Sequence, residues 1–183
     1  MTTPRAREVL TELVPVLLQA LGKTVDPDGA IAAFDRALAS MPAAVELFSI
    51  LKSYPSLLSL FADILGSAPR LTEIVGANPH VLDVVIDPSF VNGATDFDAI
   101  DSRIDKGLEH CADIEEFLDR MRDVARQEMF LTGARLLSGI VAPEVAGQAY
   151  ARIADRLIAR ALEAARAAFE KEHGRIADGR VAI

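Results

Sequence analysis

Residues 42–79 read PAAVELFSILKSYPSLLSLFADILGSAPRLTEIVGANP, and this stretch decides the fold. Proline recurs in it as Pro42, Pro55, Pro69 and Pro79, each followed by apolar residues at helical spacing. Proline is tolerated in the first turn of a helix but disrupts a helix interior, so each proline predicts a helix start. Short apolar helices are unstable in isolation and must pack on one another. The stretch therefore predicts a bundle of short helices.

Upstream of this stretch, residues 9–21 form a further apolar stripe at helical spacing, and Gly22 ends it. Pro15 falls inside the stripe, so it either kinks this helix or places the true helix start later. Asp26 and Pro27 then have the residue types of an N-cap and a first helical position. The sequence predicts that the next helix begins there.

Downstream, the pattern changes from short to long segments. A loop is predicted where Pro, Gly, Asn and Asp cluster, and a helix with an apolar stripe follows it. Two long stripes come next, with Ala142-Pro143 as the turn between them and Gly174 as the stop. The predicted segments are a loop at 87–96, a helix at about 97–110, and long helices at 113–140 and 143–173. The two long helices predict an antiparallel helical pair.

These patterns together predict an all-α fold. We expect a bundle of short Pro-started helices in residues 1–112 and a long helical hairpin in residues 113–173. Residues 174–183 are predicted to be a linker that ends in the stub of a first strand, Arg180 to Ile183. An isolated strand stub has no partner to pair with, so we expect the chain to be cut at a domain edge.

Composition excludes several classes of protein. The chain has 183 residues and a formal net charge of -8, which is unfavourable for binding nucleic acid. No apolar run approaches the roughly 18 to 20 residues that a membrane-spanning helix needs, and the N-terminus lacks the apolar region of a signal peptide. Cys111 is the only cysteine, which excludes an intrachain disulfide and a cysteine-based metal site. A cytoplasmic location is expected.

No catalytic, cofactor-binding or metal-binding residue is assigned from the sequence. Glu170 and His173 have the spacing of a di-metal helical bundle, but the second copy that such a site needs is absent. His110 and Cys111 are adjacent, and adjacent side chains on a helix point about 100° apart, which disfavours a catalytic dyad. No glycine-rich phosphate loop occurs.

Arginines recur along the two long helices, and two interpretations remain open. Arg120, Arg126 and Arg135 are predicted to contact a following domain, its nucleotide or a partner. The alternative is a solvated face on which arginines, with Arg122 among them, pair at helical spacing with Asp119, Asp123 and Glu128. On the last helix a stripe of three arginines four residues apart is expected to pair with Asp155 and Glu163; its members are Arg152, Arg156 and Arg160.

The order of these elements resembles the central region of the glutamine synthetase adenylyltransferase family. The similarity extends from about residue 10 to the end of the chain. Its stretch from Phe48 to Asp87 holds a Ser-x-Pro-Arg-Leu element at Ser67 to Leu71, which an Asn-Pro helix start at Asn78-Pro79 follows. It continues through the arginine-bearing helix at 120–140 and the next helix at 152–162. The tail HGRIADGRVAI at 173–183 resembles the segment that leads into the second nucleotidyltransferase domain.

The resemblance implies a parent enzyme that transfers AMP from ATP to a tyrosine of glutamine synthetase and removes it again. It also implies Mg²⁺ and ATP for that parent, glutamine synthetase and a PII signalling protein as partners, and flanking nucleotidyltransferase domains. The family's catalytic motif is Gly-Ser followed by two aspartates one residue apart. The only Gly-Ser in this sequence is Gly66-Ser67, followed by Ala-Pro.

The leading hypothesis is therefore a helical regulatory and linker scaffold that does not catalyse AMP transfer alone. Two alternatives stay open. One is an independent helical interaction module, although the spacing of the prolines shows no period of 30 to 47 residues as in solenoid repeats. The other is a helical domain that senses glutamine in a pocket between helices.

Overall fold

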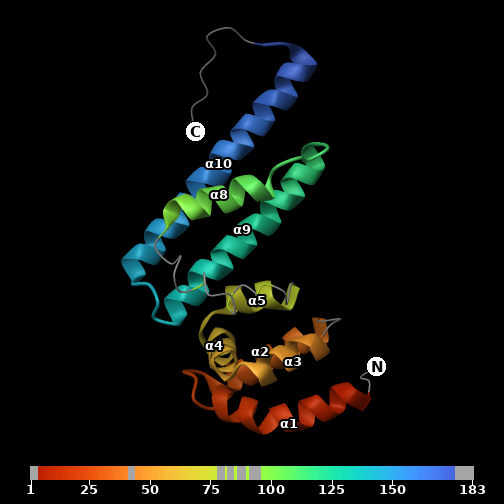
Figure 1. Ribbon diagram of the computed structural model, residues 1–183, viewed down its shortest axis with the longest axis vertical. Coiled ribbons are helices and arrows are strands. Elements are labelled where there is room, and N and C mark those ends of the chain that lie inside the picture. The colour runs from red at the N-terminus through yellow and green to blue at the C-terminus, as the bar shows by residue number, and fades with distance from the viewer. Residues whose placement is uncertain are drawn as a thin grey trace. The chain divides into compact units, whose positions relative to one another are not determined.

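The computed structural model describes residues 4–40, 44–77, 81, 85, 90 and 96–175. These residues form helices and connecting turns and contain no strand, which confirms the all-α prediction (Figure 1). The helices are α1 (Pro4–Leu21), α2 (Pro27–Ser40), α3 (Ala44–Ser53), α4 (Pro55–Ser67), α5 (Pro69–Ala77), α8 (Phe97–Gly107), α9 (Ile114–Leu137) and α10 (Pro143–His173). The predicted strand stub at 180–183 and most of the predicted loop at 87–96 lie outside the described residues.

Two compact units make up the chain. Unit 1 comprises Met1–Thr95 and Met129–Ala146, and unit 2 comprises Asp96–Glu128 and Gly147–Ile183. Helix α9 contributes residues to both units, because the division falls inside it. Compact units and folding domains are different divisions of a chain, so the domain boundaries at 112/113 and 173/174 stay predictions.

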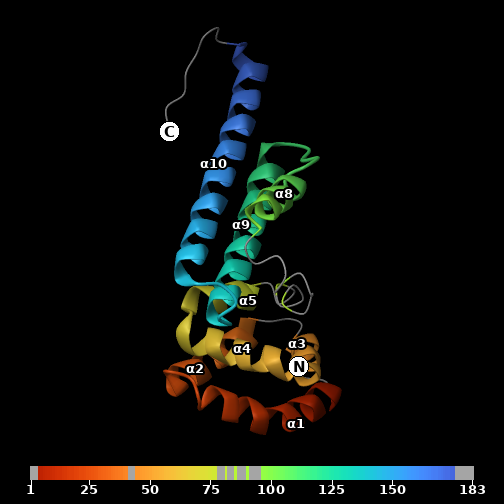
Figure 2. The same cartoon turned by 60° about the vertical axis from the view of Figure 1, so that its left-hand side comes forward.

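Unit 1 is built around α4. This helix packs against α1, α2, α3 and α5, and seven of its thirteen residues are buried. Figure 2 shows α4 between α1 and α5. The rings of Phe34, Phe48 and Phe61 meet in the core, where Phe34 lies 6.3 Å from each of the other two. Such aromatic contacts add to the stabilisation from burial of apolar surface.

Prolines and caps set the helix starts in unit 1, as predicted. Helices α2, α4 and α5 begin at Pro27, Pro55 and Pro69. Asp26 caps α2, since its Oδ1 accepts a hydrogen bond of 3.0 Å from the Gly29 N–H. The predicted start at Pro42 lies outside the described residues.

Helix α1 corrects one alternative. It runs from Pro4 to Leu21 with Pro15 inside it, so a start after Pro15 is wrong. The side chain of Pro15 is exposed, while Leu13, Leu17 and Leu21 are buried at helical spacing. Proline has no backbone N–H, so the helix lacks one hydrogen bond at this position. Burial of the leucine face stabilises the helix despite that loss.

Unit 2 holds α8 together with residues of α9 and α10. Within the part of unit 2 that the structure describes, the core consists of six buried side chains, which are Ile100, Ile104, Leu108, Phe117, Ala149 and Ile153. Asp96 caps α8 by accepting a 3.0 Å hydrogen bond from the Ala99 N–H. Helices α9 and α10 run in opposite directions (Figures 1 and 2), as the predicted antiparallel pair requires.

Helices α8 and α9 end slightly earlier than the sequence predicts, whereas α10 ends where it is predicted to end. Helix α8 ends at Gly107, and His110 in the following turn has a φ of 58°. Gly174, with a φ of 82°, follows the last residue of α10, as predicted. Glycine adopts this left-handed conformation without strain, which explains the stop. No helix in the described ranges has both the length and the apolar character needed to cross a membrane.

Candidate functional site

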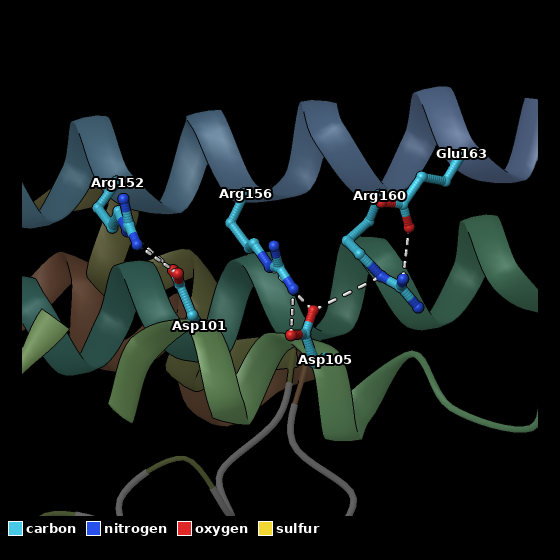
Figure 3. Close-up of polar contacts among 6 residues, drawn as sticks. All are labelled: Asp101, Asp105, Arg152, Arg156, Arg160 and Glu163. Carbon is cyan, nitrogen blue, oxygen red and sulfur yellow. Dashed lines mark hydrogen bonds and ion pairs between the residues drawn. The ribbon is translucent and has the colours of Figure 1, made fainter. Parts of the chain in front are cut away.

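A row of ion pairs in unit 2 joins α8 to α10. Asp101 and Asp105 lie four residues apart on α8, and Arg152 and Arg156 lie four apart on α10. Arg152 donates from Nε to Asp101 Oδ1 at 3.0 Å and from Nη2 to Oδ2 at 2.6 Å (Figure 3). Arg156 donates from Nε to Asp105 Oδ1 at 2.9 Å, and its Nη2 donates to Oδ2. Both pairs are bidentate, the strongest geometry for an arginine and a carboxylate.

Arg160 extends this arrangement by one more turn of α10. Its Nε lies 3.5 Å from Asp105 Oδ1, and its Nη1 donates to Glu163 Oε2 at 2.5 Å (Figure 3). We call Asp101, Asp105, Arg152, Arg156 and Arg160 the ion-pair ladder. Glu163 is the partner of Arg160 that the sequence predicts.

The ladder corrects the predicted pairing of two arginines. Arg152 and Arg156 were expected to pair along their own helix, with Asp155, but they pair with carboxylates of α8. Because the aspartates on α8 and the arginines on α10 have the same four-residue spacing, two bidentate pairs can form at once. Side chains three or four residues apart on one helix form weaker pairs. The shared spacing of Asp101 and Asp105 was the signal in the sequence that pointed to this pairing.

Electrostatically, the ladder is balanced. The three arginines face two aspartates, and Glu163 supplies the third negative charge. Hydrogen bonds from Arg152 to Asp101 raise the pKa of Arg152, and those from Arg156 to Asp105 raise the pKa of Arg156. Arg152 and Arg156 therefore stay charged near neutral pH. The ladder suits the attachment of one helix to another, and its carboxylates are committed to arginines.

A third bidentate pair attaches α8 to α9. Arg103 donates from Nε to Glu128 Oε1 at 2.6 Å and from Nη2 to Oε2 at 2.7 Å. Only 4% of Glu128 is exposed, so its charge is buried. The hydrogen bond to Glu128 raises the pKa of Arg103, while burial acts in the opposite direction. The sequence placed Glu128 with arginines of its own helix, and the structure pairs it with α8.

The three arginines predicted to contact a domain or partner lie in different surroundings. Arg120 is exposed and donates to Glu116 Oε1 at 2.6 Å and to the Glu109 carbonyl at 3.1 Å. Arg126 is also exposed and donates to Asp123 at 3.3 Å. Both belong to unit 2, and the structure does not bring them together with Arg135 in one cluster.

Arg135 lies within unit 1 and is 4% exposed. Its Nε donates to the Phe90 carbonyl at 2.8 Å, and its guanidinium carbon lies 5.7 Å from the centre of the Phe90 ring. This geometry combines a hydrogen bond with a cation–π contact. The predicted pairings at helical spacing are confirmed for Arg122 with Asp119 and for Arg126 with Asp123. Contact of the three arginines with another domain stays a prediction.

Other residues that the sequence singled out have ordinary surroundings. The thiol of Cys111 donates to the Leu108 carbonyl at 3.4 Å, and His110 is exposed. The ring of His173 lies 4.7 Å from that of Phe169, and Glu170 accepts from Arg166 at 3.4 Å. Among the residues the structure describes, no group of three or more His, Cys, Asp or Glu side chains is arranged to hold a metal ion.

Each unit also carries a hollow whose lining residues no pattern in the sequence indicated. The hollow in unit 1 has a volume of about 520 Å³, and that in unit 2 about 830 Å³. The first is lined by apolar side chains together with hydroxyl groups and one carboxylate. Its lining includes Tyr54, Ser56, Ser59, Leu60, Asp63, Phe90 and Ser138. The second lies along the C-terminal half of α10, and its lining includes Cys111, Phe117, Arg160, Ala164, Ala168 and Lys171.

Comparison with known proteins gives a consistent result. Residues 58–181 match the family model described as glutamate-ammonia ligase adenylyltransferase. The bifunctional glutamine synthetase adenylyltransferase/adenylyl-removing enzyme of Mesorhizobium japonicum is 45% identical over 97% of this chain and 18% of its own length. The proteins of the same name from Agrobacterium fabrum and Bartonella quintana are 43% and 42% identical over the same shares.

These relatives are much longer proteins, since the chain spans about a fifth of their length. No solved structure matches the chain. The family match covers well over half of the sequence and includes most of α4, all of α5 and α8, the ion-pair ladder and both long helices. The chain therefore belongs to the glutamate-ammonia ligase adenylyltransferase family.

Proposed function

We propose that this chain forms a helical regulatory and linker region of a bifunctional glutamine synthetase adenylyltransferase, and that it does not transfer AMP by itself. The observation that carries this proposal is the 45% identity over 97% of the chain to a protein named as the bifunctional enzyme. The share of that relative that is matched, 18%, leaves the greater part of it for other regions.

The activity, cofactors and partners belong to the proposal as well. The whole enzyme would use ATP and Mg²⁺ to modify glutamine synthetase, in the cytoplasm, under control of a PII signalling protein. In this scheme the nucleotidyltransferase domains hold the nucleotide, and the helical region relays the state of one domain to the other. Such a relay requires two arrangements with different affinities for the effectors. The predicted contacts of Arg120, Arg126 and Arg135 with a neighbouring domain or partner are part of the same proposal.

The proposal is supported by how the helices are joined. Helix α8 is attached by bidentate ion pairs to both α9 and α10. Helix α9 in turn contributes to both compact units. In a region built this way, a movement of one helix moves its neighbours as well. The bidentate pairs fix the register between the helices, so one helix cannot shift gradually past another.

A chimeric enzyme tests the proposal. The matched segment of the Mesorhizobium japonicum protein would be replaced by this chain, or by this chain with the charge-reversing pair Asp101→Arg and Asp105→Arg. Transfer of labelled AMP from ATP to glutamine synthetase would be measured with and without glutamine and PII protein. We expect the first chimera to transfer AMP and to respond to both effectors, and the second to transfer AMP with a weakened response. An unchanged response in the second chimera, or AMP transfer by the isolated chain, would refute the proposal.

The hollow of unit 1 favours a second candidate, a glutamine-sensing region. Its lining combines hydroxyl groups and the carboxylate of Asp63 with apolar side chains, the usual composition of a small-molecule pocket. Isothermal titration of the chain with glutamine tests this candidate. Heat of binding that disappears in Asp63→Asn supports it, and an absence of binding at millimolar glutamine rejects it.

A further inference from the structure

Buried polar side chains gather on a single helix face. Among the residues the structure describes, three polar or charged residues are buried, and they are Glu128, Thr132 and Arg135, each 4% exposed. All three belong to α9, at spacings of four and three residues, so they share one face of that helix. We call them the buried polar stripe.

The two charged ends of the stripe contact different units. Glu128 belongs to unit 2 and accepts two hydrogen bonds from Arg103 of α8 in that unit. Arg135 belongs to unit 1 and donates to the Phe90 carbonyl in that unit. The partners are distant in sequence, by 25 residues for Glu128 and by 45 for Arg135. The division between the two units falls between residues 128 and 129. Glu128 therefore belongs to unit 2, and the other two residues of the stripe belong to unit 1.

Burial alone does not explain why these residues are polar. Every residue from Phe130 to Arg135 is buried. Apolar side chains of similar size would fill the same positions without the desolvation cost of two charges. Buried polar groups have their best-attested role in fixing a single register between packed elements, because a shifted register leaves them without partners.

We propose that the buried polar stripe sets the position of α9 in both units at once, and so couples the local stability of unit 1 to that of unit 2. This inference rests on the proposed relay function and names the residues that would carry it. Loss of the Arg135 contact frees the unit 1 end of α9 to move, and because α9 is continuous through residues 129–135, the Glu128–Arg103 pair is strained in turn. By thermodynamic linkage the effect is reciprocal.

Hydrogen exchange of the 183-residue chain, followed by mass spectrometry, tests the coupling without any enzyme assay. In Arg135→Met, which keeps an unbranched apolar stem but removes the guanidinium and its donors, we expect amide exchange in α8 to rise at least about fivefold. In Arg103→Met, exchange in α4 and α5 should rise in the same way. The matched control is Leu13→Ala, a cavity in the unit 1 core away from the stripe. It should speed exchange in unit 1 and leave α8 within about twofold of wild type, well under the range typical of coupled sites.

Two results would overturn the inference. One is unchanged exchange in α8 of Arg135→Met, and the other is an equal rise in α8 of Leu13→Ala, which would make the coupling a property of the whole fold. If Arg135→Met fails to fold by circular dichroism, Arg135→Lys replaces it and is judged by the same α8 readout. Failure here leaves the chimera experiment unaffected, and failure of the chimera leaves the exchange result standing, so the two proposals fail separately.

Discussion

At the scale of single residues, the start of α9 shows how one side chain serves several donors. Asp113 Oδ1 accepts from the Glu116 N–H at 2.8 Å, and Glu116 Oε2 accepts in return from the Ala112 N–H at 2.7 Å. The other carboxylate oxygen of Glu116 accepts from Arg120 at 2.6 Å. This arrangement is a variant of the capping box and satisfies backbone donors that the helix itself cannot.

The pKa of Glu116 should be lower than that of an ordinary glutamate. The hydrogen bond from the Ala112 N–H is the main cause, followed by that from Arg120. Because folding lowers this pKa, the group stabilises the fold at pH values above its unfolded pKa, and the stabilisation is lost as the pH falls through its folded pKa. A carbon-detected NMR titration of the carboxylate should give a midpoint below that of an unfolded-chain glutamate.

Stability measurements provide the matched control for Glu116. Urea unfolding of Glu116→Gln between pH 7 and pH 3 should depend less on pH than unfolding of wild type, because Gln accepts hydrogen bonds without titrating. Glu115→Gln removes a neighbouring exposed charge that makes neither contact and should keep the pH dependence of wild type. Equal slopes for Glu116→Gln and wild type would contradict the assigned cause.

Two helical glycines should respond in opposite directions to substitution by alanine. A Cβ on Gly107 would lie 2.4 Å from Cγ2 of Val124, whereas a Cβ on Gly147 would meet nothing within 4 Å. Gly107→Ala should therefore destabilise unit 2 by about 1 to 3 kcal/mol through overpacking. Gly147→Ala should stabilise the chain by about 0.5 to 1 kcal/mol, because alanine loses less backbone entropy.

Thermal and urea unfolding measure both substitutions. The double variant Gly107→Ala/Val124→Ala should recover part of the loss, since it removes the branched side chain that the new Cβ meets. A neutral Gly107→Ala would show that α8 and α9 separate readily at this point.

At the scale of elements, the ion-pair ladder determines how α8 is attached. Arg152 and Asp101 are 47% and 19% exposed, so solvent screens part of their attraction. We expect Asp101→Arg to destabilise the chain, because the pair is lost and like-charge repulsion with Arg152 is added. The exchange variant Asp101→Arg/Arg152→Asp should recover most of the loss.

The salt dependence of unfolding distinguishes the ladder from a general effect of charge. Raising the salt concentration from 0.05 M to 1 M should reduce the difference between wild type and Asp101→Arg, because exposed ion pairs are screened. Arg122→Ala breaks a pair within α9 and should change stability by no more than about 0.5 kcal/mol at either salt concentration. A difference that does not vary with salt would argue against an ionic attachment of α8.

Local chemistry made the helix starts and the ion pairs within one helix predictable, whereas the ion pairs between helices were not. The proline ring and the carboxylate of Asp26 act on their own backbone, so their effect can be inferred from neighbouring residues alone. The same local rule failed at Pro15, where burial of distant leucines outweighs one lost hydrogen bond. Arg152 and Glu128 form ion pairs with residues on other helices. The spacing of residues along one helix does not show which helices are its neighbours.

At the scale of the whole molecule, the division into units is the feature that sequence patterns could not supply. Apolar periodicity gives the length of α9 but not which side chains of it enter which core. Phe130, Leu131 and Ala134 join the core of unit 1, while Phe117 joins that of unit 2. The all-α fold and the family were predictable, because they depend on the order of helices and not on their contacts.

A fragment that contains residues 1–95 alone should not unfold cooperatively. It lacks Phe130, Leu131 and Ala134, which are 1%, 5% and 0% exposed in the unit 1 core. Their absence would expose apolar surface, so the fragment should bind the dye ANS and show a broad urea transition. A version in which a flexible linker joins residues 1–95 to residues 129–146 should regain a cooperative transition. Cooperative unfolding of the shorter fragment would mean that the α9 residues are dispensable for unit 1.

The sharing of α9 between units also bears on how the protein folds as it is made. Synthesis proceeds from the N-terminus, so the ribosome adds residues 96–128 before the α9 residues that complete unit 1. The core of unit 1 therefore stays incomplete while the first half of unit 2 is synthesised. Unit 2 is likewise incomplete until α10 follows. Unit 1 is complete only once Ala146 has been added, and unit 2 only once the residues after it follow. Until then both cores are incomplete, and we expect the nascent chain to depend most on chaperones in this interval.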